Sequence, residues 1–349
     1  MASMGRRIGG NGFAGGIVAL VSMLAASPVL AAHHEADAQQ VDRSYVDETR
    51  GIKASNGFAG SDTRRVDIKV WRPEGEGPFP LVIYSHGTFG FASNAMHIVN
   101  ALVANGFVVA APNYPLTSRA AFTKVTFADI SDVSEQVKDI SFIIDSLLAD
   151  PELGKIIDGG RIGTTGHSLG AVTSYFASFG LMTRDRRIKA TAPIAGGDPV
   201  QTALDNPMGL AGARHAEVSI PVLFLQGDKD VFARMTGRPF AAYARVEGPK
   251  YELLVKNGYH IAFRDGVELH PDGKNPDCLF FEKNMPGVPI PGCEAAGEFI
   301  APEKQQEITR TALVDFFSAY LKEDSEALAR LQKLGETFPD TTFVAETSD

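Results

Sequence analysis

The chain has 349 residues, which is long enough for one large α/β domain or two smaller ones and for a substantial core. Hydrophobic residues make up 44% and charged residues 21%, as is ordinary for a globular protein. The formal net charge is -9 and no basic face is apparent, which argues against nucleic acid or an anionic membrane surface as a partner.

The first segment has the pattern of a secretory signal peptide. Arg6 and Arg7 precede the apolar run GFAGGIVALVSMLAASPVLA, which ends at small residues typical of a cleavage site. A membrane anchor is the alternative, but Ser and Pro interrupt the apolar run. We therefore expect cleavage near Ala31 or Ala32, a secreted or periplasmic protein, and no stable membrane anchor after cleavage.

The chain after the signal peptide divides into three expected parts. Residues 32–50 are expected to be a polar leader, and residues 51–323 one catalytic domain. Residues 324–349 form a C-terminal tail with a short helix and a strand-like end. The short stretch between Gly196 and Pro221 leaves little room for a large lid domain.

Apolar runs bounded by turn residues alternate with segments of helical periodicity along the catalytic domain. This order predicts an α/β fold with a mostly parallel central sheet and helices on both of its faces. The expected strands are 64–71, 80–87, 106–114, 161–168, 188–196, 221–228 and 250–258, and the expected helices are 93–105, 131–150, 169–180, 232–246 and 302–323.

Ser168 lies in the stretch GTTGHSLGA, between a strand-like run and a helix-like run. A nucleophile at a sharp strand-to-helix turn stands clear of the sheet, at the N-terminus of a helix. Such a turn crowds its neighbours, and Gly166 and Gly170 have no Cβ atoms that would obstruct it. The pattern therefore favours an exposed hydroxyl backed by amide groups that can receive an oxyanion.

The segment GHSLG resembles the G-x-S-x-G nucleophile elbow of the α/β-hydrolase superfamily. The chain order of that superfamily is Ser, then Asp or Glu, then His, each after a strand. The resemblance implies Asp230 as the acid, three residues after Gly227, with Asp228 as the alternative. It implies His260 as the base, because this residue lies in a turn after the next expected strand.

The resemblance also implies an oxyanion hole made of two backbone amides. Leu169, directly after the serine, would supply one amide, and Thr88 in the loop YSHGTFG the other, with Phe89 as the alternative. Phe89, Phe91 and His167 are candidates for the substrate pocket, although loop aromatics as often serve plain packing and His167 can pack beneath the turn.

Cys278 and Cys293 are the two cysteines of the chain, and the stretch between them has no obvious secondary structure. Both lie in residues 264–300, where the family resemblance fades and which we therefore interpret as an inserted loop. An exported protein meets an oxidising compartment, so we predict a disulfide rather than two free thiols. A bridge over a loop of this size contributes roughly 3 kcal/mol in the chain-entropy model. We expect the bridged loop to shape the substrate cleft, so that its loss alters KM more than catalysis.

Longer stretches, including VDIKVWRPEGEGPFPLVIYSHG and DGGRIGTTGHSLGAVTSY, resemble the dienelactone-hydrolase-like and platelet-activating-factor-acetylhydrolase-like branch of the superfamily. Together with the signal-peptide pattern, this resemblance implies an exported serine esterase that cleaves carboxylic esters through an acyl-enzyme, with no cofactor and no metal. The substrate would be a small or polymeric ester. The alternatives are a polyester or lipid-ester depolymerase or lipase, an exported peptidase or amidase, and a non-catalytic binding protein on the same fold.

Overall fold

The computed structural model describes residues 38–123, 128–205, 208, 210, 215–232, 240–284, 286–287, 290, 292–293 and 296–347. These residues belong to one compact unit, His34–Asp349. The predicted signal peptide and its cleavage site lie outside the described residues. No helix within the described ranges is long and apolar enough to cross a membrane.

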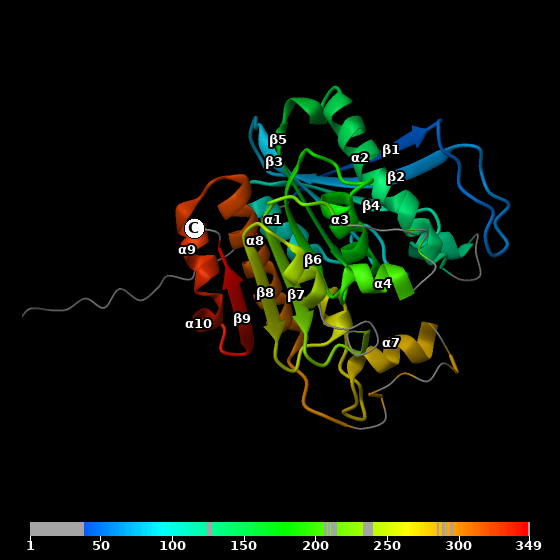
Figure 1. Cartoon of the computed structure of the whole chain (residues 1–349). Coiled ribbons are helices and arrows are strands. Elements are labelled where there is room, and N and C mark those ends of the chain that lie inside the picture. Colours follow the sequence, from blue (N-terminus) through cyan, green and yellow to red (C-terminus); the bar gives the residue numbers. More distant parts are fainter. Residues whose placement is uncertain are drawn as a thin grey trace, which may run out of the picture. The chain divides into compact units, whose positions relative to one another are not determined.

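A nine-stranded sheet runs through the described part of the chain in the order β1-β2-β4-β3-β5-β6-β7-β8-β9 (Figure 1). The strands from β4 to β8 in this order are parallel, whereas β1, β2 and β9 pair antiparallel at the two edges. The strands are β1 (Gln39–Asp47), β2 (Arg64–Arg72), β3 (Phe79–Ser85), β4 (Val108–Asn113), β5 (Ile157–His167), β6 (Ile188–Ile194), β7 (Val222–Gly227), β8 (Lys250–Val255) and β9 (Thr341–Glu346).

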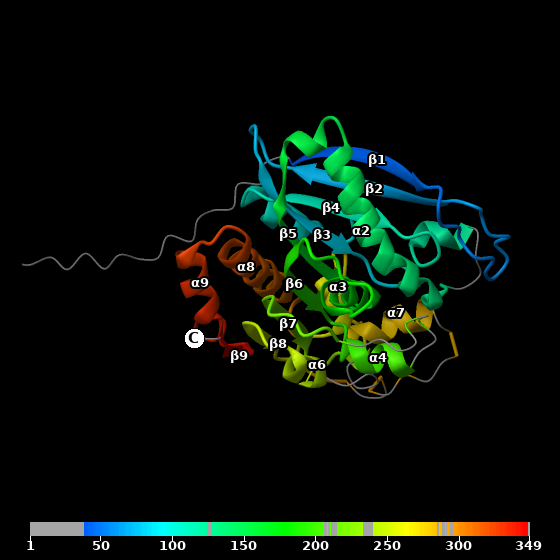
Figure 2. The same ribbon diagram turned by 45° about the horizontal axis from the view of Figure 1, so that its top comes forward.

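Helices cover both faces of the sheet, as the alternating sequence pattern predicts (Figures 1 and 2). One apolar core joins the sheet to α2 and α3, and a second core joins it to α1, α8 and α9 on the other face. The helices are α1 (Met96–Ala104), α2 (Val133–Ala149), α3 (Leu169–Phe179), α4 (Pro199–Asp205), α6 (Phe240–Arg245), α7 (Pro276–Asn284), α8 (Pro302–Leu321), α9 (Ser325–Gln332) and α10 (Leu334–Thr337).

This architecture confirms the predicted α/β-hydrolase fold, and the described residues contain no large lid domain.

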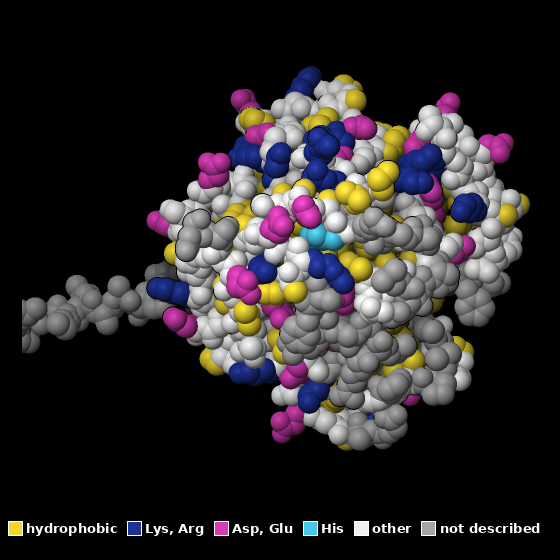
Figure 3. All heavy atoms as spheres, viewed as in Figure 1, with side chains coloured by type: hydrophobic (Ala, Val, Ile, Leu, Met, Phe, Trp, Pro, Cys, Tyr) yellow, Lys and Arg dark blue, Asp and Glu magenta, His cyan; other side chains and the backbone are white. Residues whose placement is uncertain are grey.

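Lys and Arg side chains lie interspersed with Asp and Glu on the face of the molecule shown in Figure 3.

Three segments differ from the sequence-based expectation. Residues 39–47, expected in a polar leader, form edge strand β1 against β2. The insertion contains a helix, α7, where no secondary structure was expected. The helix expected over 93–105 begins at Met96, where the carboxylate of Asp265 accepts the first amide hydrogen bonds.

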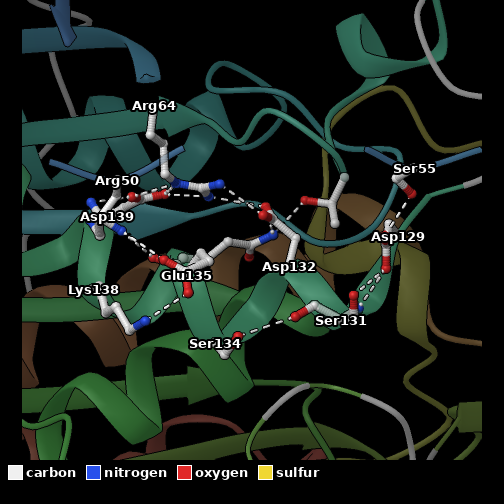
Figure 4. A network of polar contacts seen from close by, with 12 residues as sticks. Arg50, Ser55, Arg64, Asp129, Ser131, Asp132, Ser134, Glu135, Lys138 and Asp139 are labelled. Carbon is white, nitrogen blue, oxygen red and sulfur yellow. Dashed lines mark hydrogen bonds and ion pairs between the residues drawn. The ribbon is translucent and has the colours of Figure 1, made fainter. Parts of the chain in front are cut away.

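A buried ion-pair network ties the start of α2 to β2 (Figure 4). Arg64 has no exposed side-chain surface, and its guanidinium lies 2.8 Å from Asp132 and 2.7 Å from Asp139. Arg50 reaches the same Asp139 carboxylate at 2.8 Å. The network fixes the segment that carries Ile130, two residues before Asp132, at the edge of the cavity described below.

We expect Arg64→Met to lower the free energy of unfolding by about 3 kcal/mol, because it leaves two buried carboxylates without their main cation. Arg65→Met is the matched control, since the pair that Arg65 makes with Asp67 is exposed and its loss should cost less than about 1 kcal/mol. Urea denaturation of both variants measures the difference. Equal midpoints would show that the buried network does not stabilise the fold.

Candidate active site

Ser168 lies at the turn from β5 to α3 with φ 58° and ψ -119°, a left-handed conformation that is strained for a residue with a Cβ. The turn closes because its flanking residues are glycines. A Cβ on Gly166 would strike the backbone of Gly170, and a Cβ on Gly170 would strike the backbone of Ser85 in β3. The serine is therefore held at the carboxyl edge of the sheet and at the N-terminus of α3.

His260 and Asp230 form a hydrogen-bonded pair on two neighbouring turns. The ring Nδ1 of His260 lies 2.9 Å from Oδ2 of Asp230, and both side chains are buried. An ionised carboxylate only accepts, so Nδ1 donates, and in the neutral imidazole Nε2 is then the acceptor. The turns follow β7 and β8, which are adjacent parallel strands, and the Lys229 amide donates to the Gly258 carbonyl at 2.8 Å.

Further hydrogen bonds hold the Asp230 carboxylate. The Phe232 amide donates to Oδ1 at 2.8 Å, and the Gln226 side chain donates to Oδ2. Asp228, the alternative acid, has an exposed side chain. The structure thus places Asp230, and not Asp228, against the ring of His260.

Two aromatic rings enclose the imidazole of His260. The ring centroid of Phe232 lies 4.3 Å from that of His260, and the centroid of His167 lies at 4.6 Å. His167 Nε2 donates to the carbonyl of His260 at 2.9 Å. Burial, and next the proximity of His260, hold the pKa of His167 well below its usual value, so His167 is a neutral donor that supports the His260 backbone.

Ser168 and His260 line one cavity of about 170 Å³. The cavity lies at the carboxyl ends of the central strands, where the first turn of α3 meets the loop after β6. Its other lining residues are mostly apolar: Thr88, Ile130, Leu169, Val172, Ala195, Gly196, Thr202, Met208 and Phe232.

The candidate oxyanion residues Thr88 and Leu169 both line this cavity. Leu169 is the first residue of α3, where amides have no partner within the helix. The Phe89 amide donates to the carbonyl of Thr117 at 2.9 Å, which leaves Thr88 as the better placed donor of the two alternatives.

His86 supports the loop that carries Thr88. Its Nδ1 donates to the Gly87 carbonyl at 2.8 Å, and its Nε2 accepts from the Tyr114 amide at 3.1 Å. Burial lowers the pKa of His86 to about 4, so the ring is neutral near pH 7 and can fill both roles.

The candidate pocket residues lie elsewhere in the described structure. Phe89 packs against Phe280 with centroids 6.1 Å apart, and Phe91 packs under the guanidinium of Arg119. His167 is buried behind His260. Several residues that do line the cavity lie just after strand ends or one turn into α3, and a search of those positions would have found Ala195, Gly196 and Val172, whereas no local signal marks Ile130, Thr202 or Met208.

The predicted disulfide between Cys278 and Cys293 is present, with a sulfur–sulfur distance of 2.01 Å. Cys278 lies in the first turn of α7, so the bridge joins this helix to the later part of the insertion.

Comparison with known proteins identifies the family. A family model described as chlorophyllase matches residues 49–223, half of the chain, a range that includes Thr88, Ser168 and Leu169. No curated protein matches the sequence. A solved ferulic acid esterase from Streptomyces cinnamoneus has 19% sequence identity and a TM-score of 0.61, covering 87% of this chain and 95% of that chain.

The structural match confirms the α/β-hydrolase fold, and the family match confirms the resemblance to esterases of that fold. The finer resemblance to the dienelactone-hydrolase-like branch stays a prediction. The chain belongs to the chlorophyllase family of α/β-hydrolase serine esterases and is a carboxylic ester hydrolase.

Proposed function

We propose that this esterase cleaves its substrate with a Ser168–His260–Asp230 triad, through an acyl-enzyme. The observation that carries the proposal is the combination of two features. The imidazole of His260 donates to Asp230 from Nδ1, and the same histidine shares a cavity with a serine held at a strained turn. A histidine oriented by a carboxylate, in the same cavity as a serine at a strained turn, is the combination from which base-assisted attack by a serine proceeds.

In the proposed reaction, Ser168 Oγ attacks the ester carbonyl while His260 Nε2 takes the hydroxyl proton. The amides of Leu169 and Thr88 donate to the oxyanion that forms. His260 then gives its proton to the leaving alkoxide, and the carbon–oxygen bond to the alcohol breaks. Water, deprotonated by His260, attacks the acyl-enzyme and releases the acid and the free serine. Asp230 orients the imidazole and stabilises its charged form throughout.

The shape of the cavity supports a compact acyl group as the preferred acid part of the ester. The space beside Ser168 is small, and the side chains of Ile130, Val172 and Met208 make its wall apolar. An apolar wall binds hydrocarbon well and gives no partner to a charged group.

We also propose that the protein is exported. The signal-peptide pattern before residue 32 supports this, and so does the disulfide, because disulfides persist in oxidising compartments.

We expect Ser168→Ala to lower the turnover of p-nitrophenyl acetate by at least about 1000-fold, because the nucleophile is lost. A fluorophosphonate probe should label the wild type at Ser168 and should not label the variant. Thermal unfolding of both proteins controls for the fold. Turnover that is unchanged in the folded variant would exclude the triad, and a wild type that resists the probe would favour a non-catalytic binding protein.

We expect Val172→Phe to shift specificity towards short acyl chains, because the larger side chain occupies part of the cavity beside Ser168. Val172→Ala is the matched variant and should shift it towards longer chains. The measurement is kcat/KM on p-nitrophenyl esters from acetyl to palmitoyl, with methyl ferulate and chlorophyll added because the relatives' names point to them. If both variants keep the wild-type preference, the cavity does not bind the acyl group.

We expect the mature protein to begin near residue 32, because cleavage is predicted near Ala31 or Ala32. Expression in a Gram-negative host, fractionation and N-terminal sequencing measure this. Leu20→Arg places a charge in the apolar run and should leave unprocessed protein in the cytoplasm. An intact N-terminus on wild-type protein in every fraction would contradict the proposal.

A further inference from the structure

The insertion places a second buried carboxylate, that of Asp277, against the backbone of the turns that carry Asp230 and His260. Helix α7 lies beyond the carboxyl ends of β7 and β8, and Asp277 is in its first turn (Figure 1). The side chain of Asp277 has no exposed surface. Its position was not predicted from the sequence, because nothing local marks this aspartate among the acidic residues of the insertion.

The Asp277 carboxylate accepts backbone hydrogen bonds from both catalytic turns. Oδ2 accepts from the His260 amide at 3.0 Å and from the Val231 amide at 3.3 Å, and Oδ1 accepts from the Ile261 amide at 2.9 Å. Val231 directly follows Asp230. One carboxylate therefore connects the turn that carries the acid to the turn that carries the base.

Asn275 extends the same connection. Its side-chain amide donates to the Lys229 carbonyl at 2.7 Å, and its side-chain oxygen accepts from the Asp277 amide at 2.9 Å. The acid turn is thus held on both sides of Asp230, at Lys229 and at Val231. We call Asn275 and Asp277 together the insertion clip.

The orientation of Asp277 excludes a role as the acid that orients the imidazole. Its carboxylate faces the backbone amide of His260, whereas the ring Nδ1 of His260 faces Asp230. Burial, and next the negative charge of Asp230, raise the pKa of Asp277, while hydrogen bonds from the backbone amides oppose this shift. Burying a carboxylate whose neighbour is a second buried carboxylate costs free energy, which argues that Asp277 does more than fill space.

We propose that Asp277 is a positioning residue, which sets the distance and orientation of His260 relative to Asp230 through the backbone of both turns. The disulfide from the adjacent Cys278 to Cys293 anchors α7 and so maintains the insertion clip. This inference rests on the proposed function, because it assigns Asp277 a role in the chemistry of that triad. The clip acts on catalysis rather than on substrate binding, since neither of its residues lines the cavity in the described part of the chain.

The main test compares Asp277→Asn with Asp272→Asn, an exposed aspartate of the same insertion that serves as the matched control. The side-chain amide of the new asparagine has one oxygen and one NH₂ group, so it cannot accept hydrogen bonds at both positions, and at least one backbone amide of the two turns loses its acceptor. We expect kcat to fall about 100-fold and KM to stay within about twofold, because small misplacements of catalytic groups act on the transition state. Asp272→Asn should behave as the wild type.

A double-mutant cycle separates positioning from general stability. Asp230→Asn should lower kcat strongly by itself, and Asp277→Asn should add little in that background if Asp277 acts through the pair. The downfield proton resonance of His260 Nδ1–H offers a second readout. We expect it to be sharp in the wild type and broadened in Asp277→Asn. Losses that simply multiply, or a folded Asp277→Asn with kcat within about threefold of the wild type, would overturn the proposal.

Asn275→Ala is the second variant if Asp277→Asn does not fold, because it keeps the Asp277 carboxylate and removes the side-chain hydrogen bonds of Asn275 with Lys229 and with the Asp277 amide. It should lower kcat about tenfold at unchanged KM, and wild-type kinetics would overturn the proposal. The Cys278→Ser/Cys293→Ser pair should also lower kcat, which differs from the effect on KM expected from the sequence.

Labelling with the fluorophosphonate probe distinguishes a failure of the proposed triad from a failure of the role assigned to Asp277. A wild type that is not labelled at Ser168 would defeat the proposed function, and the inference with it. A wild type that is labelled, together with an Asp277→Asn variant that is labelled equally fast, would defeat the inference alone.

Discussion

The strained turn at Ser168 is the constraint on which the rest of the site depends. A left-handed serine costs on the order of 1 to 3 kcal/mol and persists only where the surroundings enforce it. Here the backbones of Gly166, Gly170 and Ser85 pack against one another with no space for a Cβ. Every residue of α3 is buried, so the helix cannot move to relieve the strain. The packing of the fold thereby holds the hydroxyl in the cavity.

The same edge of the sheet supplies the other groups. Parallel strands end side by side, so the turns after β5, β7 and β8 meet although Ser168, Asp230 and His260 are distant in sequence. The turns after β7 and β8 also contact each other directly through their backbones, since a Cβ on Gly227 would strike the backbone of Gly258. The insertion clip adds a further link from outside the sheet.

The sequence predicted the central strands well because a strand buried on both faces is an uninterrupted apolar run. It did not predict β1 as a strand, because an edge strand such as QQVDRSYVD is half exposed and its polar residues resemble a leader. Helix α7 was missed for a related reason. The segment PDCLFFEKN has almost no one-sided apolar pattern, and its place is set by Asp277 and by the disulfide.

The sequence by itself determined the fold class and the serine at the elbow, because glycine spacing and apolar runs are local requirements of the backbone. It also indicated a cysteine pair that could bridge. Only the tertiary structure decided that Asp230, and not Asp228, lies against His260. Only it showed that the Phe89 amide donates to the Thr117 carbonyl and that Val172 and Met208 line the cavity. These outcomes depend on which side chains meet across distant turns, and that is decided by packing in three dimensions.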